Sequence, residues 1–237
     1  MTAEQEIVIF PGHLCNHRMY EPLLHALPDI AAMRVADLYN DDSVEAIARR
    51  ALSEARRTFV LIANSMGGAV ALEALHQAPD RVSGLILIGT TARPEFHAQS
   101  SRRERAIGLT ETEDWAAMTK LYAPIFFHPD NRRVDPCLDK TLAAMIGDQT
   151  AKRIRNQQKA FAARADRRPM LASIQCPTLI ICGREDAITP IEHSHELAAG
   201  IADSTLVVLE QCGHIPTLEQ PSVTVASILH FLRQFTW

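Results

Sequence analysis

The sequence is short of the features that mark several classes of protein. Its formal net charge is −4 at pH 7, so it lacks the basic excess by which proteins bind nucleic acid. No apolar run approaches the roughly 20 residues that a membrane-spanning helix requires. Residues 1–6 are polar and acidic, unlike the basic and apolar sections of a signal peptide. We therefore expect no nucleic-acid partner and no membrane association.

Paired cysteines and metal-binding patterns are also missing. The five cysteines are odd in number and include no Cys-x-x-Cys spacing, which favours reduced thiols in a cytoplasmic protein. His193 and His195 are two residues apart and would face different directions on a helix. His13 and His17 have no carboxylate pattern beside them. We expect no metal and no cofactor, and the sequence leaves open whether the protein is a monomer or a homodimer.

The sequence does contain an alternation of apolar strands and helices. Its 237 residues, 47% of them hydrophobic and 22% charged, suffice for one sizeable core. The expected strands are 7–10, 33–37, 59–62, 84–89, 177–182 and 205–209, and the expected helices are 19–26, 41–55, 69–76, 191–199 and 223–235. This order predicts an α/β fold whose sheet has about six strands, mostly parallel, with helices on both faces.

The alternation stops between residues 92 and 168. This stretch has no comparable apolar strand but has helix-like segments at 113–122, 137–147 and 151–165, and it carries 15 Lys and Arg against 10 Asp and Glu. We interpret 92–168 as an inserted helical cap, or lid, on a core formed by 1–91 and 169–237. Its positive balance is usual for a solvated surface, and it also fits a substrate that carries a carboxylate.

One serine stands at a turn between a buried strand and a helix. Ser65 follows the strand at 59–62 and is itself followed by two glycines and the helix at 69–76. This is the layout of a nucleophile elbow, in which a strained turn exposes the serine hydroxyl. The residues two positions away on either side must be small, and they are Ala63 and Gly67, with Ala63 in place of the usual glycine.

Two further polar residues follow the ends of later strands. Asp186 comes after the strand at 177–182, and His214 comes after the strand at 205–209. A serine hydroxyl needs a base, and the base needs a carboxylate that orients it, so Ser65, His214 and Asp186 form a candidate catalytic triad. Glu185 is an alternative acid. A loop acid paired with Arg184 is the structural alternative for Asp186, and a polar turn residue is the alternative for His214.

With these motifs the sequence resembles the α/β-hydrolase superfamily over essentially its whole length. The matching stretches are 11–15, 64–68, 176–179 with 183–186, and 213–221, and the last two are typical of small, cap-bearing, esterase-like members. The resemblance implies an α/β-hydrolase fold and the order Ser…Asp…His. It also implies an oxyanion hole made by the backbone N–H groups of Met66 and His13, with Leu14 as a weaker candidate for the second donor.

The resemblance and the triad together predict a serine esterase. We expect a carboxylesterase that cleaves small esters through an acyl-enzyme on Ser65. Residues 64–68 are also similar to the elbow of carbon–carbon bond hydrolases that act on ring-fission products. Those enzymes usually have tryptophan after the catalytic histidine, where this chain has Ile215. Enol-lactone hydrolysis, acyl transfer to hydrogen peroxide and a non-enzymatic small-molecule receptor remain further alternatives.

Overall fold

A single parallel sheet forms the centre of the molecule. The computed structural model describes residues 6–27, 31–95 and 97–234. Its strands are β1 (Glu6–Phe10), β2 (Ala32–Val35), β3 (Phe59–Asn64), β4 (Val82–Ile88), β5 (Thr178–Gly183) and β6 (Ser204–Leu209). They pair in the order β2-β1-β3-β4-β5-β6, with every neighbouring pair parallel. The expected α/β fold with about six parallel strands is confirmed.

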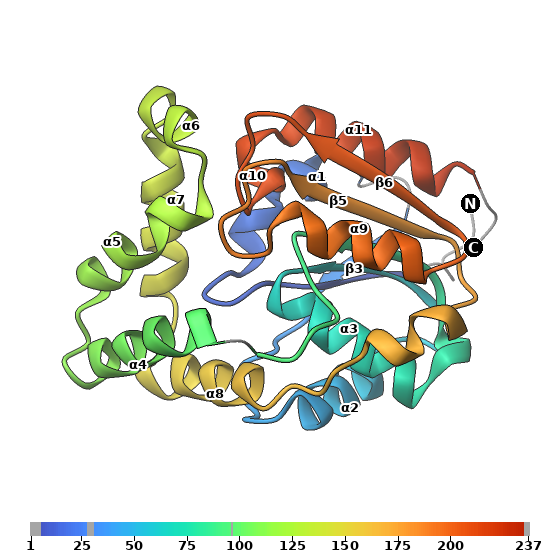
Figure 1. Ribbon diagram of the computed structural model, residues 1–237, viewed down its shortest axis with the longest axis horizontal. Helices are drawn as coiled ribbons and strands as arrows, with labels where there is room; N and C mark the ends of the chain where they lie inside the picture. The colour runs from blue at the N-terminus through green and yellow to red at the C-terminus, as the bar shows by residue number, and fades with distance from the viewer. Residues whose placement is uncertain (1–5, 28–30, 96, 235–237) are drawn as a thin grey trace.

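Helices cover both faces of this sheet (Figure 1). Side chains alternate along each strand, so Ile7 and Ile9 belong to one apolar cluster while Val8 and Phe10 belong to the other. The first cluster includes residues of α1 (Glu21–Ala26) and α11 (Pro221–Leu232). The second includes residues of α2 (Val44–Glu54), α3 (Met66–Gln77) and α9 (Ile191–Gly200). Burial on both faces explains why the central strands are almost entirely apolar.

Five α-helices follow one another between β4 and β5 in the described part of the chain. They are α4 (His97–Glu111), α5 (Trp115–Phe126), α6 (Pro129–Val134), α7 (Cys137–Gly147) and α8 (Ala151–Ala162), and we call them the α4–α8 segment. They lie together at one end of the molecule, to the left of the sheet in Figure 1. The expected helices at 113–122, 137–147 and 151–165 correspond to α5, α7 and α8. The division of the chain into a core and a cap at 92–168 stays a prediction.

Several element boundaries differ from the expected ones for local reasons. The helix expected at 19–26 is divided into a 3-10 turn, η1 (His17–Tyr20), and α1, whose first turn holds Pro22. Proline fits the first turn because the N–H it lacks would have no acceptor there. The helix expected at 223–235 begins earlier, at Pro221, and ends at Leu232. Residue 235 lies outside the described residues.

The remaining connections are short. They include the 3-10 turns η2 (Pro79–Arg81) and η3 (Arg168–Ser173) and the short helix α10 (Pro216–Glu219). All five cysteines are free thiols. No helix in the described part of the chain is both long and apolar enough to cross a bilayer.

Candidate active site

Ser65 occupies a strained turn between β3 and α3. Its backbone has φ 53° and ψ −116°, a conformation that non-glycine residues rarely adopt. The Ser65 N–H donates to the carbonyl of Ile88 at 2.9 Å, and the Thr90 hydroxyl donates to the carbonyl of Ser65 at 2.7 Å. The Asn64 amide also donates to the Ile88 carbonyl, at 3.0 Å. Contacts with β4 and the loop after it therefore hold the turn in place.

Two glycines allow the turn to pack against the first strand. A Cβ atom on Gly67 would lie 2.1 Å from the carbonyl oxygen of Phe10, so no larger residue fits there. A Cβ on Gly12 would lie 2.7 Å from Oδ1 of Asn64 and 3.3 Å from Cβ of Ser65. The loop after β1 consequently lies directly against the serine. The small residue expected two positions after Ser65 is thus required by the packing of α3 on β1.

The three side chains of the candidate triad meet at the carboxyl ends of their strands. The Ser65 Oγ lies 2.8 Å from Nε2 of His214, and Nδ1 of the same ring lies 2.7 Å from Oδ2 of Asp186. His214 is 1% exposed and Asp186 is 4% exposed. Residues separated by as many as 149 positions in the chain are therefore assembled into a continuous hydrogen-bonded relay.

Asp186 is held by donors besides His214. Its Oδ1 accepts the backbone N–H groups of Ile188 at 2.8 Å and Thr189 at 2.9 Å, and its Oδ2 accepts the Thr189 hydroxyl at 2.7 Å. Burial by itself raises the pKa of Asp186, but the charge of His214 and the hydrogen bonds from His214 and Thr189 outweigh it and leave the pKa below its ordinary value. The carboxylate is therefore ionised and able to orient the imidazole.

The two neighbours of Asp186 have other partners. The Glu185 side chain is exposed and accepts the backbone N–H of Cys212 at 3.1 Å. Arg184 pairs with Glu210 at 2.7 Å instead of with Asp186. The structure therefore brings Asp186, and not Glu185, to the histidine, and it does not contain the Arg184–Asp186 pair considered from the sequence.

The loop that carries His214 is tied to the α4–α8 segment. The His214 N–H donates to the carbonyl of Phe126, the last residue of α5, at 2.8 Å, and the two rings lie 5.6 Å apart. Glu219 accepts the N–H groups of Gly213 at 2.9 Å and His128 at 2.7 Å, so one carboxylate joins both segments. Glu219 stands in the recognised stretch 213–221, but nothing in the sequence indicated this bridging role.

The expected oxyanion donors belong to the residue after Ser65 and to the loop after β1. Met66 begins α3, and the first N–H groups of a helix have no acceptor within it. Leu14 has φ 61°, and its N–H donates to Oε1 of Gln157 at 2.9 Å, so that group is already engaged. The backbone N–H of His13 has no acceptor among the residues that the structure describes. This arrangement favours His13 over Leu14 as the second donor.

Two glutamines of α8, which the sequence analysis did not single out, hold the His13 ring. The Nδ1 atom of His13 lies 2.8 Å from Oε1 of Gln157, and its Nε2 lies 2.7 Å from Nε2 of Gln158. An amide oxygen accepts and an amide nitrogen donates, so the ring is neutral with its proton on Nδ1. Burial is the main cause that lowers the pKa of His13, the hydrogen bond with Gln157 opposes it and the charge of Arg102 adds to it, so that the pKa is about 4.

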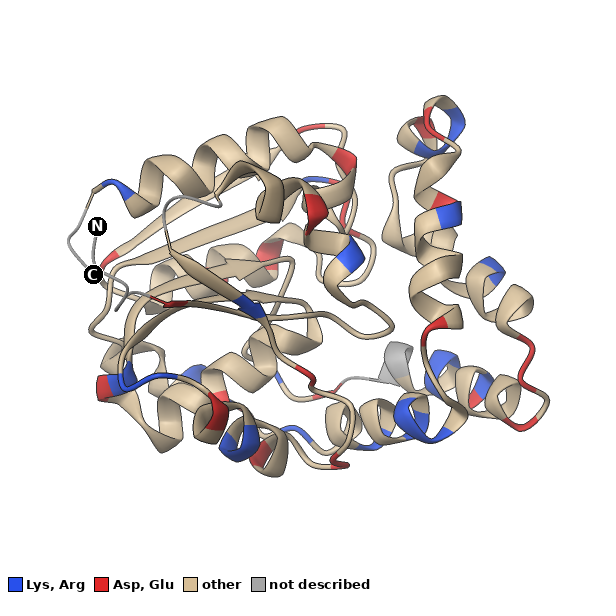
Figure 2. Ribbon diagram, turned by 180° about the vertical axis from the view of Figure 1, so that it is seen from behind, with Lys and Arg blue, Asp and Glu red and all other residues tan. Residues whose placement is uncertain are grey.

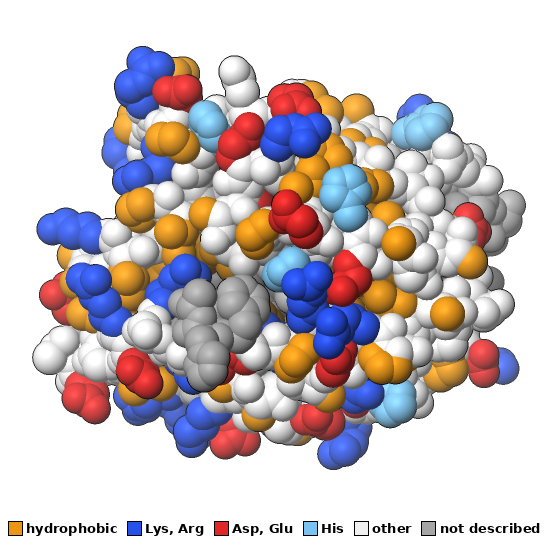
Figure 3. All heavy atoms as spheres, in the orientation of Figure 1, with side chains coloured by type: hydrophobic (Ala, Val, Ile, Leu, Met, Phe, Trp, Pro, Cys, Tyr) orange, Lys and Arg blue, Asp and Glu red, His pale blue; other side chains and the backbone are white. Residues whose placement is uncertain are grey.

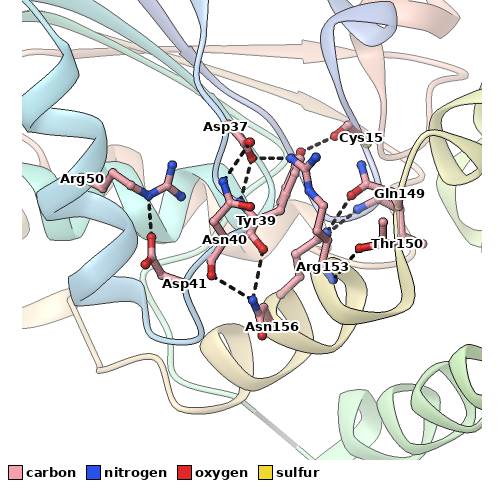
Figure 4. Close-up of polar contacts among 12 residues, drawn as sticks. Cys15, Asp37, Tyr39, Asn40, Asp41, Arg50, Gln149, Thr150, Arg153 and Asn156 are labelled. Carbon is pink, nitrogen blue, oxygen red and sulfur yellow. Dashed lines mark hydrogen bonds and ion pairs between the residues drawn. The ribbon is translucent and has the colours of Figure 1, made fainter.

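A second set of contacts joins α8 to the loop after β2 (Figure 4). Asn156 donates to the carbonyls of Tyr39 at 3.3 Å and Asn40 at 3.0 Å, and Arg153 pairs with Asp37. The Tyr39 hydroxyl in turn donates to the carbonyl of Gly12 at 3.1 Å. The loop that contains His13 is therefore supported both from α8 and from the core.

A small cavity opens at Ser65. Its volume is about 50 Å³, and its walls include His13, Tyr122, Phe126 and residues of α4 and α8. Larger hollows of about 350 Å³ and 430 Å³ lie beside η2 and beside the end of β2, and neither includes a residue of the triad. Among the described residues no cluster of His, Cys, Asp and Glu could hold a metal ion.

The sequence and the fold of the chain are similar to those of known proteins. The model of the alpha/beta hydrolase family matches residues 7–228. The chain is 27% identical over 180 residues to the 2-hydroxy-6-oxo-6-phenylhexa-2,4-dienoate hydrolase of Comamonas testosteroni, a match that covers 73% of this chain but only 62% of that protein. It is 24% identical over 255 residues to the pimeloyl-[acyl-carrier protein] methyl ester esterase of Aliivibrio salmonicida, with 96% and 92% covered. The malate-bound structure of a thermophilic esterase from Thermogutta terrifontis superposes with a TM-score of 0.84 at 26% identity, over 98% of this chain and 90% of that one.

Proposed function

Because the chain belongs to the alpha/beta hydrolase family, and its serine, histidine and aspartate are hydrogen-bonded in series, we propose that this hydrolase is a carboxylesterase that cleaves small esters. The observation that carries the proposal is the contact of 2.8 Å between Ser65 Oγ and His214 Nε2 at the wall of a cavity. It supplies an activated hydroxyl beside a space for an acyl group.

The geometry supports a two-step acyl transfer. Ser65 Oγ attacks the ester carbonyl while His214 Nε2 accepts its proton, and Asp186 stabilises the resulting imidazolium. The negative oxygen of the tetrahedral intermediate accepts hydrogen bonds from the backbone N–H groups of Met66 and His13. Losing one such donor typically raises the activation free energy by about 3 kcal/mol. His214 then protonates the departing alcohol. In the second step water attacks the acyl-enzyme, His214 takes the water proton, and the acid leaves as Ser65 regains its proton.

The dimensions of the cavity support small substrates. Its volume of about 50 Å³ is small beside ordinary ligand pockets of several hundred Å³. The ring of Phe126 packs 5.4 Å from that of Tyr122, and both rings line the cavity. We therefore expect short acyl groups to be preferred to long ones.

Carbon–carbon bond hydrolysis is the second candidate. The similarity to a dienoate hydrolase supports it, and the stretch 64–68 resembles the elbow of such enzymes. Ile215 argues against it, because it stands directly after the histidine where those enzymes usually have tryptophan. Enol-lactone hydrolysis would use the same triad. A receptor role without chemistry is disfavoured by the complete relay from Asp186 to Ser65.

Turnover of p-nitrophenyl esters from acetate to octanoate tests the proposal. We expect the wild-type protein to prefer the shorter esters and Ser65→Ala to lose activity by at least about 1,000-fold. A serine-directed phosphonate should label the wild type and not the variant, as measured by intact mass. Equal rates for both proteins would refute the esterase. A much higher kcat/KM on a 2-hydroxy-6-oxo-dienoate than on any ester would move the assignment to carbon–carbon hydrolysis.

A further inference from the structure

The cavity at Ser65 contains an arginine without a counter-charge. Among the described residues, the charged ones that line it are Glu95, Arg102 and Arg103. Glu95 forms an ion pair with Arg103, and both side chains are largely buried. Arg102 is half-buried and has neither an ion pair nor a hydrogen bond among the residues that the structure describes. The cavity therefore holds one positive charge in excess.

Basic residues are common in α4 and α8, but other Lys and Arg residues there are paired or exposed to solvent, unlike Arg102. Lys and Arg gather along α4 and α8 (Figure 2), and basic side chains are scattered over the face seen in Figure 3. Arg153 pairs with Asp37, and Arg105 is exposed to solvent. A solvated surface accounts for such residues, but it does not account for a half-buried, unpaired cation on the wall of the Ser65 cavity.

A hydroxyl donor lines the same cavity. The Tyr122 side chain is 4% exposed, and its oxygen accepts a hydrogen bond from Nε2 of Gln158 at 3.2 Å. The proton of that hydroxyl has no acceptor among the described residues. Burial raises the pKa of Tyr122 to about 12, so the group remains a donor at neutral pH. Arg102 lines the same cavity as Tyr122 and His13, and its charge lowers the pKa of both groups.

We propose that Arg102 and Tyr122 bind a carboxylate of the substrate, so that the preferred substrates are short esters that also carry a carboxylate group. This inference rests on the proposed esterase function. A carboxylate would neutralise the excess charge and could accept from both the guanidinium and the phenol. The triad would act at the ester carbonyl while the second functional group of the substrate is held at α4. Such a substrate can carry its carboxylate on the acyl side or on the alcohol side.

The test compares each acidic ester with its neutral amide. Monomethyl glutarate and methyl glutaramate differ only in carboxylate against amide on the acyl side, and O-acetylglycolate and O-acetylglycolamide do so on the alcohol side. For the wild type we expect kcat/KM to favour the acid at least about 10-fold in one of the two pairs, mainly through KM. The pair that shows the preference identifies the side that carries the carboxylate.

Variants assign this preference to the two residues. Arg102→Gln should bring the acid-to-amide ratio to about 1, Arg102→Lys should retain part of it, and Tyr122→Phe should lower it several-fold. Arg105→Gln changes an exposed arginine on the same helix and should leave the ratio unchanged. Thermal unfolding of each variant establishes that it is folded.

The outcomes separate this inference from the function on which it rests. If the wild type cleaves acids and amides equally well, or if Arg102→Gln keeps the full ratio, the carboxylate site is refuted while the esterase stands. If no ester is cleaved and the phosphonate leaves Ser65 unlabelled, the esterase is refuted. Calorimetry with glutarate then still decides on the carboxylate site, because binding must be present in the wild type and lost in Arg102→Gln.

Discussion

At the scale of single residues, the neighbouring acids Asp186 and Glu185 show how environment decides a role. Asp186 is buried and receives hydrogen bonds from His214, Ile188 and Thr189, whereas the carboxylate of Glu185 is exposed and holds the N–H of Cys212. Both are carboxylates that follow the same strand. Only the one that a turn directs at the imidazole can fix its tautomer and stabilise its charged form.

We therefore expect opposite results from two conservative substitutions. Asp186→Asn should lower kcat on a short p-nitrophenyl ester on the order of 10³- to 10⁴-fold, because the amide cannot balance the imidazolium. Glu185→Gln keeps an oxygen acceptor for Cys212 and should change kcat less than about threefold. Steady-state kinetics on the two purified variants checks this, with thermal unfolding as a control for folding. A large loss in Glu185→Gln and a small one in Asp186→Asn would transfer the role to Glu185.

Gln157 is a positioning residue for the loop that carries His13. Its side chain is fully buried, and one oxygen accepts both the Leu14 N–H and the His13 ring. Gln157→Leu removes that acceptor and frees the loop, so we expect kcat to fall about 10-fold or more with little change in KM. The rate of phosphonate labelling of Ser65 should fall in parallel. The exposed Gln175→Leu is the matched control. A rise in KM at constant kcat would show that Gln157 serves substrate binding instead.

At the scale of elements, the close packing of α3 against β1 leaves no space for a larger residue at the nucleophile elbow. The first turn of α3 approaches the carbonyl of Phe10 so closely that a Cβ on Gly67 would lie 2.1 Å away from it. Backbone atoms of a central strand cannot move aside without disturbing the sheet. By contrast, a Cβ on Gly108, an exposed position within α4, would meet nothing within 4 Å.

Two glycine-to-alanine substitutions should therefore change the stability of the protein in opposite directions. Gly67→Ala should destabilise the protein by at least about 2 kcal/mol through overpacking, or prevent it from folding. Gly108→Ala should stabilise it by about 0.5–1 kcal/mol, because alanine loses less conformational freedom in a helix. In a chain of this size about 1 kcal/mol corresponds to a change in melting temperature of about 2–4 °C. Calorimetry measures both changes, and a Gly67→Ala protein as stable as the wild type would show that α3 can move away from β1.

At the scale of the whole molecule, the sequence predicted the strands and the residues that follow their ends. It did not predict contacts between side chains that are far apart in the sequence. Apolar, β-branched runs located the strands, and because parallel strands end at one edge, the residues after β3, β5 and β6 were expected together. The helix α4 was missed because polar and charged residues predominate in it. The bonds from Gln157 to Leu14 and His13 span more than 140 residues, and no local pattern indicates such a pairing.

The partly buried His13 also gives the whole molecule a pH dependence of stability. The folded pKa of His13 is about 4, whereas an unfolded histidine titrates near 6.5. Between these values the unfolded chain binds more protons, so the free energy of unfolding must fall as pH falls from 6.5 to 4. At 1.36 kcal/mol per pH unit, this interval corresponds to a loss of about 3 kcal/mol from His13 alone.

Replacing His13 should remove its contribution to the pH dependence of the free energy of unfolding. We expect His13→Gln to be less stable than the wild type at pH 7.5, since it disturbs the contacts with Gln157 and Gln158, but to lose less stability on acidification. Urea unfolding at pH 7.5, 6.5, 5.5 and 4.5 gives the two curves, and in their difference the contributions of other titrating groups cancel. Below pH 6.5 the difference between the two free energies of unfolding should narrow by about 1.36 kcal/mol per pH unit, the effect of one proton. The reason is that only the wild type must keep this histidine neutral in its folded state. Parallel curves would mean that His13 accepts a proton in the folded protein as readily as in the unfolded chain.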